Sequence, residues 1–342
     1  MLNRTQILLL LLSAAVSCAA QSSIADTAPR AVLEVIKVGG PDGWDYTTFD
    51  PATHTLYIAH GSAIATVNTT TKAATPHLAD AQGAHIAVPF ADGSKLLVTH
   101  GKANQVTLND AKTGAVEATI PTDAKPDAAL IEPTTGRGFV MANGGGTVDV
   151  IDLNKKAVIA RIAVGGAPEA ATFDGKGLVF THLEDHNAMV VIDAKAMKVR
   201  ATYPMSGCDD PSGIAAIPKK GLILSACANQ IARVTNAATG AEVASLPIGK
   251  HPDSAFFDED RQLGYVPCGD GTLTVISFKD DAARVTEVVV TQAGARTGAV
   301  DPATGLVYLP TAEFGAPARA GGRPSIVPDT LRVLVIGASR RQ

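Results

Sequence analysis

Seven polar or charged residues recur along the chain at intervals of 40 to 43 residues. They are Asp45, His85, Asp127, Glu169, Ser212, Asp253 and Arg296. Four of the seven are carboxylates, and carboxylates held close together repel one another, which raises their pKa values and favours a bound cation. If the fold brings the seven together, the set can bind a small molecule, a peptide or a cation. Glu169, Asp253 and His85 are then the candidates for moving a proton.

Histidines suggest a second kind of chemistry at the same place. His60 and His100 accompany His85 and Asp45 in the first two repeats. Imidazole nitrogen and carboxylate oxygen are ligands that suit zinc or copper. These four residues are a candidate site for a divalent metal ion. The alternative is that the histidines lie at an exposed rim and hydrogen-bond to loop backbone.

A repeated phrase surrounds the seven residues and indicates the elements that position them. It reads GWDYTTFDP around Asp45, KPDAALIEP around Asp127 and DPSGIAAIP around Ser212. A polar residue is followed each time by a short run of small or apolar residues and then a turn. A period near 40 residues, with several short strands in each period, is typical of a β-propeller blade. Seven periods therefore predict an all-β, seven-bladed β-propeller.

Each period resolves into four strands joined by turns rich in Asn, Asp and Gly. The last period lacks an outer strand after residues 330–336, and the spare strand is AVLEVIKV at residues 31–38. We expect these two segments to pair and close the ring, which removes edges that would otherwise pair with other chains. The seven recurring residues begin the innermost strands and should surround one mouth of the central channel. The second strands run back toward that mouth, so His60 and His100 should reach it as well.

Two further features border the predicted mouth. Trp44, the single tryptophan, precedes Asp45 and can stack on a planar ligand or a base. Alternatively, its ring packs between the first and last blades. The long Pro- and Gly-rich segment Thr311 to Pro328 is either a lid over the mouth or a strap on the surface.

The start of the chain has the pattern of a targeting segment. Arg4 precedes an apolar run from Ile7 to Val16, and small residues follow. This pattern predicts a signal peptide over residues 1–20 and a single propeller domain over residues 21–342. The apolar run is too short for a stable membrane anchor. We expect a periplasmic or secreted protein, with lipid modification of Cys18 as the alternative.

Three cysteines follow that segment, namely Cys208, Cys227 and Cys268. Export permits disulfides, and an odd number leaves one thiol spare. Cys208 lies just before the fifth inner strand, and Cys227 ends the next strand of the same blade. Because both should reach one rim, we predict a Cys208–Cys227 disulfide and a free Cys268.

Several stretches resemble the exported YncE-like branch of the YVTN-repeat propellers. They are GGPDGWDYTTFDP (39–51), CDDPSGIAAIPKKGLILSAC (208–227), GDGTLTVI (269–276) and GARTGAVDPATGLVYLPTAEFG (294–315). The resemblance implies an exported seven-bladed propeller with the same disulfide, and it implies no particular reaction. One member of that family is reported to bind single-stranded DNA, and related propellers include lactonases and lyases. This chain departs from the family at the rim, where His60, His100 and His182 replace Asn, Arg or Ser, and Cys268 replaces Asn.

The composition limits the functions to consider. A net charge of −4 gives no broad basic field for nucleic acid, and the chain contains neither a GxSxG nor a CxxCH motif. The leading hypothesis is a binding or scaffolding protein with a ligand or cation at the channel mouth. A metal-assisted lactonase or lyase that uses the same mouth is the alternative, with a divalent metal as its cofactor. Binding of single-stranded nucleic acid is the third hypothesis, and the acidic mouth disfavours it.

Overall fold

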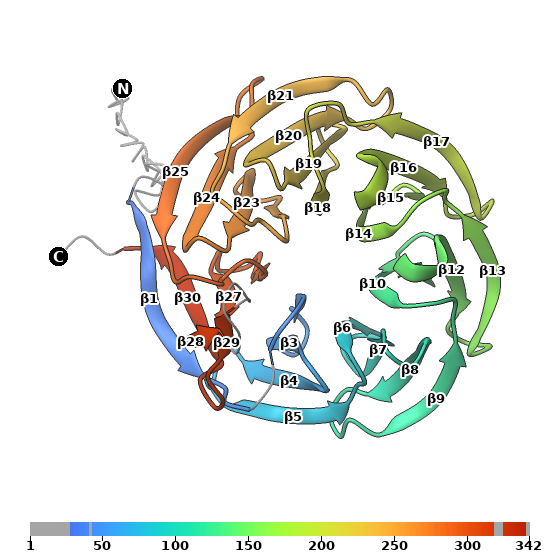
Figure 1. Cartoon of the computed structure of the whole chain (residues 1–342), viewed down its shortest axis with the longest axis horizontal. Coiled ribbons are helices and arrows are strands. Elements are labelled where there is room, and N and C mark those ends of the chain that lie inside the picture. The colour runs from blue at the N-terminus through green and yellow to red at the C-terminus, as the bar shows by residue number, and fades with distance from the viewer. Residues whose placement is uncertain (1–27, 41–42, 318–323, 340–342) are drawn as a thin grey trace, which may run out of the picture.

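Seven four-stranded antiparallel sheets stand around a central axis like the blades of a fan (Figure 1). The computed structural model describes residues 28–40, 43–317 and 324–339. The prediction of an all-β, seven-bladed propeller is therefore confirmed. The expected signal peptide over residues 1–20 and Cys18 lie outside the described residues.

The first six blades take their four strands from consecutive segments, and the seventh combines both ends of the chain. The innermost strands are β2 (Thr47–Asp50), β6 (Ala84–Phe90), β10 (Pro126–Glu132), β14 (Pro168–Phe173), β18 (Pro211–Ile217), β22 (Phe256–Asp258) and β26 (Ala299–Val300). The second strands are β3 (Thr55–His60), β7 (Lys95–His100), β11 (Arg137–Ala142), β15 (Leu178–Leu183), β19 (Leu222–Cys227), β23 (Leu263–Cys268) and β27 (Val307–Thr311).

Two further layers complete each blade. The third strands are β4 (Ala63–Asn68), β8 (Gln105–Asp110), β12 (Thr147–Asp152), β16 (Ala188–Asp193), β20 (Ile231–Asn236), β24 (Thr272–Ser277) and β30 (Arg332–Ala338). The outer strands are β5 (Ala74–Asp80), β9 (Val116–Pro121), β13 (Ala157–Ala163), β17 (Lys198–Pro204), β21 (Glu242–Pro247), β25 (Arg284–Val290) and β1 (Arg30–Lys37). Second and third strands are almost entirely buried because they pack against the neighbouring blades on both faces.

Local side-chain chemistry explains why each blade folds back on itself. In the outer turn of blade two, Asp110 Oδ1 accepts hydrogen bonds from the backbone N–H groups of Lys112 and Thr113. Gly114 then adopts a φ of +73°, and a Cβ there would lie 1.9 Å from the carbonyl oxygen of Leu78. Only glycine satisfies both conditions, so the Asp-to-Gly spacing ends β8 and starts β9.

The ring is closed by β1, which pairs antiparallel with β30 from Arg30 opposite Ala338 to Lys37 opposite Arg332. This confirms the predicted closure by the N-terminal strand. Ile36 is buried against Tyr308, Val333 and Val335 of the last blade. Arg30 also forms a 3.2 Å ion pair with Glu287 on β25, which joins the sixth and seventh blades.

The predicted disulfide between Cys208 and Cys227 is confirmed. The two residues have Cα atoms 5.2 Å apart and join the entry of the fifth inner strand to the end of β19. Cys268 is free and fully buried, and burial raises the pKa of its thiol to about 12. A thiol with that pKa is an inert packing group at neutral pH.

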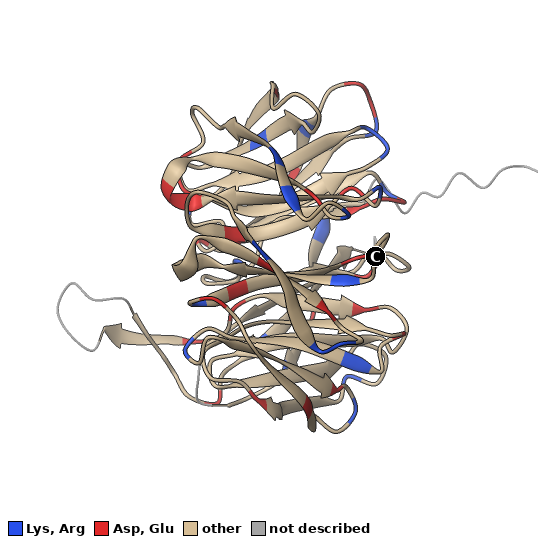
Figure 2. Ribbon diagram, turned by 90° about the vertical axis from the view of Figure 1, so that its right-hand side faces the viewer, with Lys and Arg blue, Asp and Glu red and all other residues tan. Residues whose placement is uncertain are grey.

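The segment after Thr311 forms a small hairpin of β28 (Phe314–Pro317) and β29 (Pro324–Ile326). The hairpin stands out from one face of the disc, near its rim and away from the central axis (Figures 1 and 2). Phe314 packs against Trp44 with 6.1 Å between ring centroids. The described part of this segment therefore borders the mouth and does not cover it.

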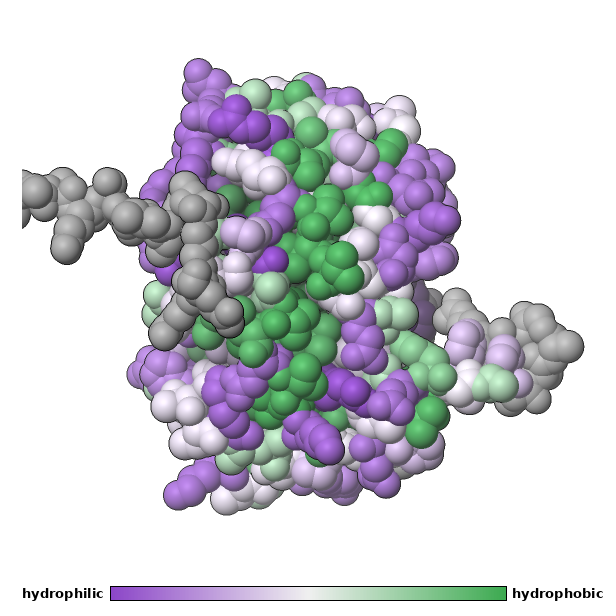
Figure 3. Space-filling model, turned by 90° about the vertical axis from the view of Figure 1, so that its left-hand side faces the viewer, coloured by the Kyte–Doolittle hydropathy of each residue, from purple (hydrophilic) through white to green (hydrophobic). Residues whose placement is uncertain are grey.

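The outer surface is apolar over one part of the rim. On the side formed by β25 and β1, Figure 3 shows a band of hydrophobic side chains. The exposed apolar residues of these two strands are Val288 and Val290 on β25 and Val32, Leu33 and Val35 on β1. This band lies on the side of the disc and is separate from the polar mouth.

Closure by β1 can be tested with two neighbouring residues of that strand. Ile36→Ala should lower the free energy of unfolding by about 2–4 kcal/mol, because it removes buried apolar volume from the closing contact. Val35→Ala is the matched control, since Val35 is 49% exposed, and it should cost under about 1 kcal/mol. Urea denaturation monitored by tryptophan fluorescence measures both, and equal losses would contradict the closing role of Ile36.

Candidate functional site

The recurring residues gather around one mouth of the channel, at or just before the starts of the innermost strands. His85, Asp127, Glu169 and Ser212 are the second residues of β6, β10, β14 and β18. Asp45, Asp253 and Arg296 lie two or three residues before β2, β22 and β26. Contacts run between neighbouring blades: the Thr297 hydroxyl donates to the carbonyl of Asp45 at 2.9 Å, and the Ser212 hydroxyl donates to the carbonyl of Pro252 at 3.1 Å.

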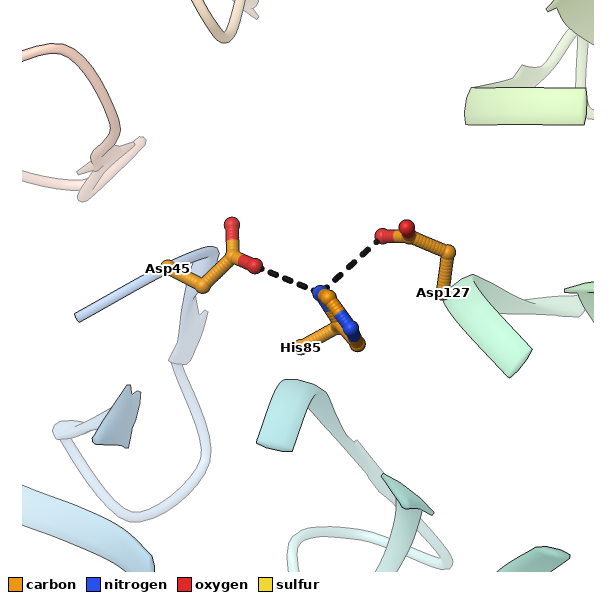
Figure 4. A group of neighbouring side chains, drawn as sticks. All are labelled: Asp45, His85 and Asp127. Atoms are coloured by element: carbon orange, nitrogen blue, oxygen red, sulfur yellow. Dashed lines mark hydrogen bonds and ion pairs between the residues drawn. The ribbon is translucent and has the colours of Figure 1, made fainter. Parts of the chain in front are cut away.

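Three of these residues form a compact group. His85 Nδ1 lies 2.6 Å from Asp45 Oδ2 and 3.3 Å from Asp127 Oδ1, so one nitrogen faces two carboxylates from two other blades (Figure 4). A single N–H can donate a good hydrogen bond to only one of them. Asp127 is therefore left with the longer contact, although it is only 5% exposed.

The charges of this group change the proton affinities of its members. Burial lowers the pKa of His85, but the hydrogen bond to Asp45 and the charges of Asp127 and Asp45 outweigh burial, and the pKa is raised overall. Burial raises the pKa of Asp127 to about 6, with His85 opposing the shift and Asp45 adding to it. The group thus has an excess of negative charge in a poorly solvated position.

Tyr46 crosses the channel from the first blade to the fourth. Its hydroxyl donates a 3.1 Å hydrogen bond to Glu169 Oε1, and the Asn143 side chain donates to Glu169 Oε2 at 3.3 Å. Burial and the charges of Asp127 and Glu184 raise the pKa of Glu169 to about 8. Glu169 is therefore largely protonated at neutral pH, and the pKa of Tyr46 is raised as well, first by burial and then by Glu169.

Sequence reasoning named the residue before Tyr46 and missed Tyr46 itself. The sequence feature that could have identified Tyr46 is its position directly after the recurring residue. The other six repeats carry smaller residues there, namely Ile86, Ala128, Ala170, Gly213, Ser254 and Thr297. A tyrosine in a column of smaller residues must extend into the channel. Below it lies a cavity of about 290 Å³, lined mostly by small residues such as Ala128, Ala170 and Gly298.

Asp253 and Arg296 form the remaining charged pair of the mouth, with Arg296 Nε 2.6 Å from Asp253 Oδ2. Burial raises the pKa of Asp253, and the Arg296 charge opposes that shift. Arg296 is thus already committed to one carboxylate. Asp45 and Asp127 share the single imidazole of His85, and Glu169 accepts from the Tyr46 hydroxyl and the Asn143 side chain.

The proposed metal set of His60, His85, His100 and Asp45 is only partly assembled. Among the described residues, the one group of three or more side chains with ligand atoms close enough for a metal is Asp45, His85 and Asp127, all within 4.8 Å. His100 is turned into its own blade, where Nδ1 accepts from the Gln82 N–H and Nε2 contacts the Thr107 hydroxyl. His60 and His100 end second strands, which lie farther from the axis than the inner strands. The third potential ligand beside Asp45 and His85 is therefore Asp127, from an inner strand.

Three other residues near the mouth, His60, His182 and Trp44, are buried and pack within the propeller. The His60 ring is buried against Gly40, where a Cβ would lie 2.2 Å from its Cε1 atom. His182 bonds to the Ser225 hydroxyl and faces the Ser212 carbonyl, and burial lowers its pKa to about 4. Trp44 is 9% exposed within a cluster that joins the first and last blades, as in the packing alternative.

Glu169 predicts a measurable pH dependence of stability. The folded state holds this proton up to about pH 8, whereas an unfolded glutamate releases it near pH 4.5, so stability falls as pH rises between these values. Glu169→Gln should raise Tm relative to the natural chain at pH 8 and have little effect near pH 5. Thermal unfolding at several pH values measures this. The exposed Asp260→Asn is the control, and a Tm difference independent of pH would contradict the assignment.

Comparison with known proteins supports the fold and gives no family. No family model matches the chain, and no curated protein matches it. Among solved structures, a chain of the crystal structure of the mitotic checkpoint complex is similar, with a TM-score of 0.74, 14% identity, and coverage of 98% of this chain and 99% of that one. A chain of Kuenenia stuttgartiensis hydrazine synthase has a TM-score of 0.70 and 17% identity, over 80% of this chain and 94% of that one. At these identities the likeness establishes the propeller architecture alone.

The resemblance to YncE-like YVTN-repeat propellers is not confirmed by any family match and stays a prediction. Within the described residues, no helix has both the length and the apolar character needed to cross a membrane.

Proposed function

We propose that this chain is a non-catalytic binding or scaffolding protein that takes a positively charged ligand at the mouth formed by the seven recurring residues. The proposal includes export, with residues 1–20 as a signal peptide and residues 21–342 as one propeller domain of the YncE-like type. The Cys208–Cys227 disulfide supports export, because such bonds persist in oxidising compartments. The ligand class follows from the charge of the mouth.

One observation carries the proposal: four carboxylates meet at the mouth, and among the described residues Arg296 is the one permanent cation paired directly with any of them. Lys125 also acts on Asp127, but its ammonium group donates its hydrogen bond to Asn143 Oδ1. Arg296 pairs with Asp253. Burial raises the pKa values of Asp127 and Glu169 to about 6 and about 8, so both carboxylates are poorly compensated. A cation placed 4 Å from an ionised carboxylate would gain roughly 4 kcal/mol at an effective dielectric constant of about 20. A bound cation would also favour release of the proton that Glu169 holds. The same charges repel phosphate, which disfavours nucleic acid.

An enzyme is the second candidate, and Glu169 is the observation that favours it. A carboxyl group with a pKa of about 8 is protonated at neutral pH and lies beside the Tyr46 hydroxyl. Such a group can donate a proton to a leaving oxygen. A metal-assisted lactonase or lyase would use His85 or Asp253 as the partner group. Hydrolysis or elimination on a panel of lactones, lost in Glu169→Gln and retained in Asp260→Asn, would favour this candidate over the binding protein.

Charge removal at the mouth tests the binding proposal. The triple variant Asp127→Asn, Glu169→Gln and Asp253→Asn should bind spermidine and a lysine-rich peptide at least tenfold more weakly than the natural chain does. The charges of Asp127 and Asp253 are removed, and position 169 can no longer ionise when a cation binds. Isothermal titration calorimetry measures affinity and stoichiometry, and circular dichroism checks folding.

The matched control is the triple variant Asp92→Asn, Asp260→Asn and Asp281→Asn, which replaces three carboxylates by amides at exposed positions. It should retain the natural affinity. Equal loss in both triple variants would mean that only net charge attracts the ligand. Unchanged binding after neutralising the mouth would remove the proposal.

A further inference from the structure

We propose that Asp45, His85 and Asp127 form a binding site for one divalent first-row transition metal ion, such as Zn²⁺, which joins the first three blades at the channel mouth. The inference deepens the proposed function and rests on it, because it assigns the positive charge at the mouth to a metal ion. The ligands would be His85 Nδ1 and one oxygen from each carboxylate.

The distances are close to those of a metal site. Zinc binds nitrogen and carboxylate oxygen at about 2.0–2.2 Å, so the ligand atoms of a tetrahedral site lie about 3.4 Å apart. Asp127 Oδ1 is already 3.3 Å from His85 Nδ1. Asp45 Oδ2 is 2.6 Å from the same nitrogen, as expected when a proton lies between them. Replacement of that proton by an ion requires Asp45 to move by less than about 1 Å, which a side chain before the start of β2 can do.

Asp127 is the independent sign that a ligand is missing from this group. It is 5% exposed, and the one polar contact described for its carboxylate within 4 Å is the shared Nδ1 of His85. Buried carboxylates normally accept several hydrogen bonds or bind a metal. Glu132, a buried glutamate at the end of the same strand, accepts hydrogen bonds from the N–H groups and hydroxyls of Thr134 and Thr135. The side chain of Asp127 points instead toward the nitrogen it shares with Asp45 (Figure 4).

The backbone around His85 leaves room for this orientation. Gly101 follows β7, and a Cβ at this position would lie 2.7 Å from both Cδ2 and Nε2 of His85. The imidazole therefore packs directly on the glycine backbone, and no larger residue fits without displacing the ring. Gly101 acts as a positioning residue that holds Nδ1 between the two carboxylates.

The donor set selects the class of metal. One imidazole nitrogen with two carboxylate oxygens suits Zn²⁺, Mn²⁺ or Co²⁺, whereas Ca²⁺ requires six to eight oxygen ligands. The free thiol of Cys268 is not part of the group, so soft ions such as Cu(I) are disfavoured. Three protein ligands leave at least one position open to water or to a second ligand from the mouth.

The test is titration of the metal-free full-length protein with Zn²⁺, and separately with Ca²⁺, by isothermal calorimetry. We expect one Zn²⁺ per chain, a rise in Tm of several degrees because binding stabilises the folded state, and no comparable response to Ca²⁺. His85→Gln and Asp127→Asn should each weaken Zn²⁺ binding at least 100-fold. Visible absorption of the Co²⁺ form should change in the same variants.

Two further variants separate the site from general effects. Gly101→Ala changes no ligand and should weaken Zn²⁺ binding at least tenfold by moving His85. Asp260→Asn makes a similar substitution at an exposed position outside the mouth, keeps all three ligands and should change the affinity by less than about threefold. Failure of His85→Gln to fold would leave Gly101→Ala and Asp127→Asn as the deciding variants.

The outcomes also separate this inference from the proposed function. Absence of Zn²⁺ binding, or Zn²⁺ binding that survives His85→Gln, would overturn the metal site, the latter because the ion would then lie at exposed pairs such as His77 with Asp80. Spermidine binding sensitive to the mouth would still support the proposed function in either case. Zn²⁺ binding lost in His85→Gln, with no mouth-dependent binding of organic cations, would support the metal site and restrict the ligand to the ion.

Discussion

Every feature of the mouth depends on the backbone hydrogen bonds between β1 and β30. Six of the blades are local structures, each made from consecutive segments of the chain. Only the seventh joins the two ends and fixes how many blades share the axis. Once the ring has closed, side chains about 40 residues apart in sequence lie within hydrogen-bonding distance of one another. Without that pairing β30 would present an open edge, and the first and last blades would have no reason to meet.

The closed ring holds groups together that would separate in water. Each recurring side chain lies at or near the start of a rigid strand, so the carboxylates at the mouth cannot move apart to relieve their repulsion. The protein responds in three ways at once. Asp253 takes Arg296 as its counter-ion, Glu169 keeps its proton, and Asp45 shares His85 with Asp127. Groups held in an unfavourable electrostatic state by a scaffold are typical of binding and catalytic sites.

Much of the architecture could be predicted from the sequence because a period near 40 residues constrains all seven blades together. The spare strand at residues 31–38 and the Cys208–Cys227 bridge followed from the same count of strands. The repeat also indicated which residue of each blade lies at or just before the start of the inner strand. The repeat contained no information on the direction of side chains, however. For this reason it could not predict where the rings of the second-strand histidines point. His100 occupies the expected strand end, yet its ring is turned into hydrogen bonds with Gln82 and Thr107. The repeat did not predict a role for Tyr46, because the equivalent position in the other six blades carries a smaller residue and a single tyrosine forms no recurring pattern.

Tyr46 links opposite parts of the ring, because it belongs to the first blade and its hydroxyl donates a hydrogen bond to Glu169 of the fourth. The same side chain also lines the cavity of about 290 Å³, whose other walls are mostly small residues. A substitution at this one position therefore alters the charged mouth and the cavity together, so neither can evolve at Tyr46 without the other.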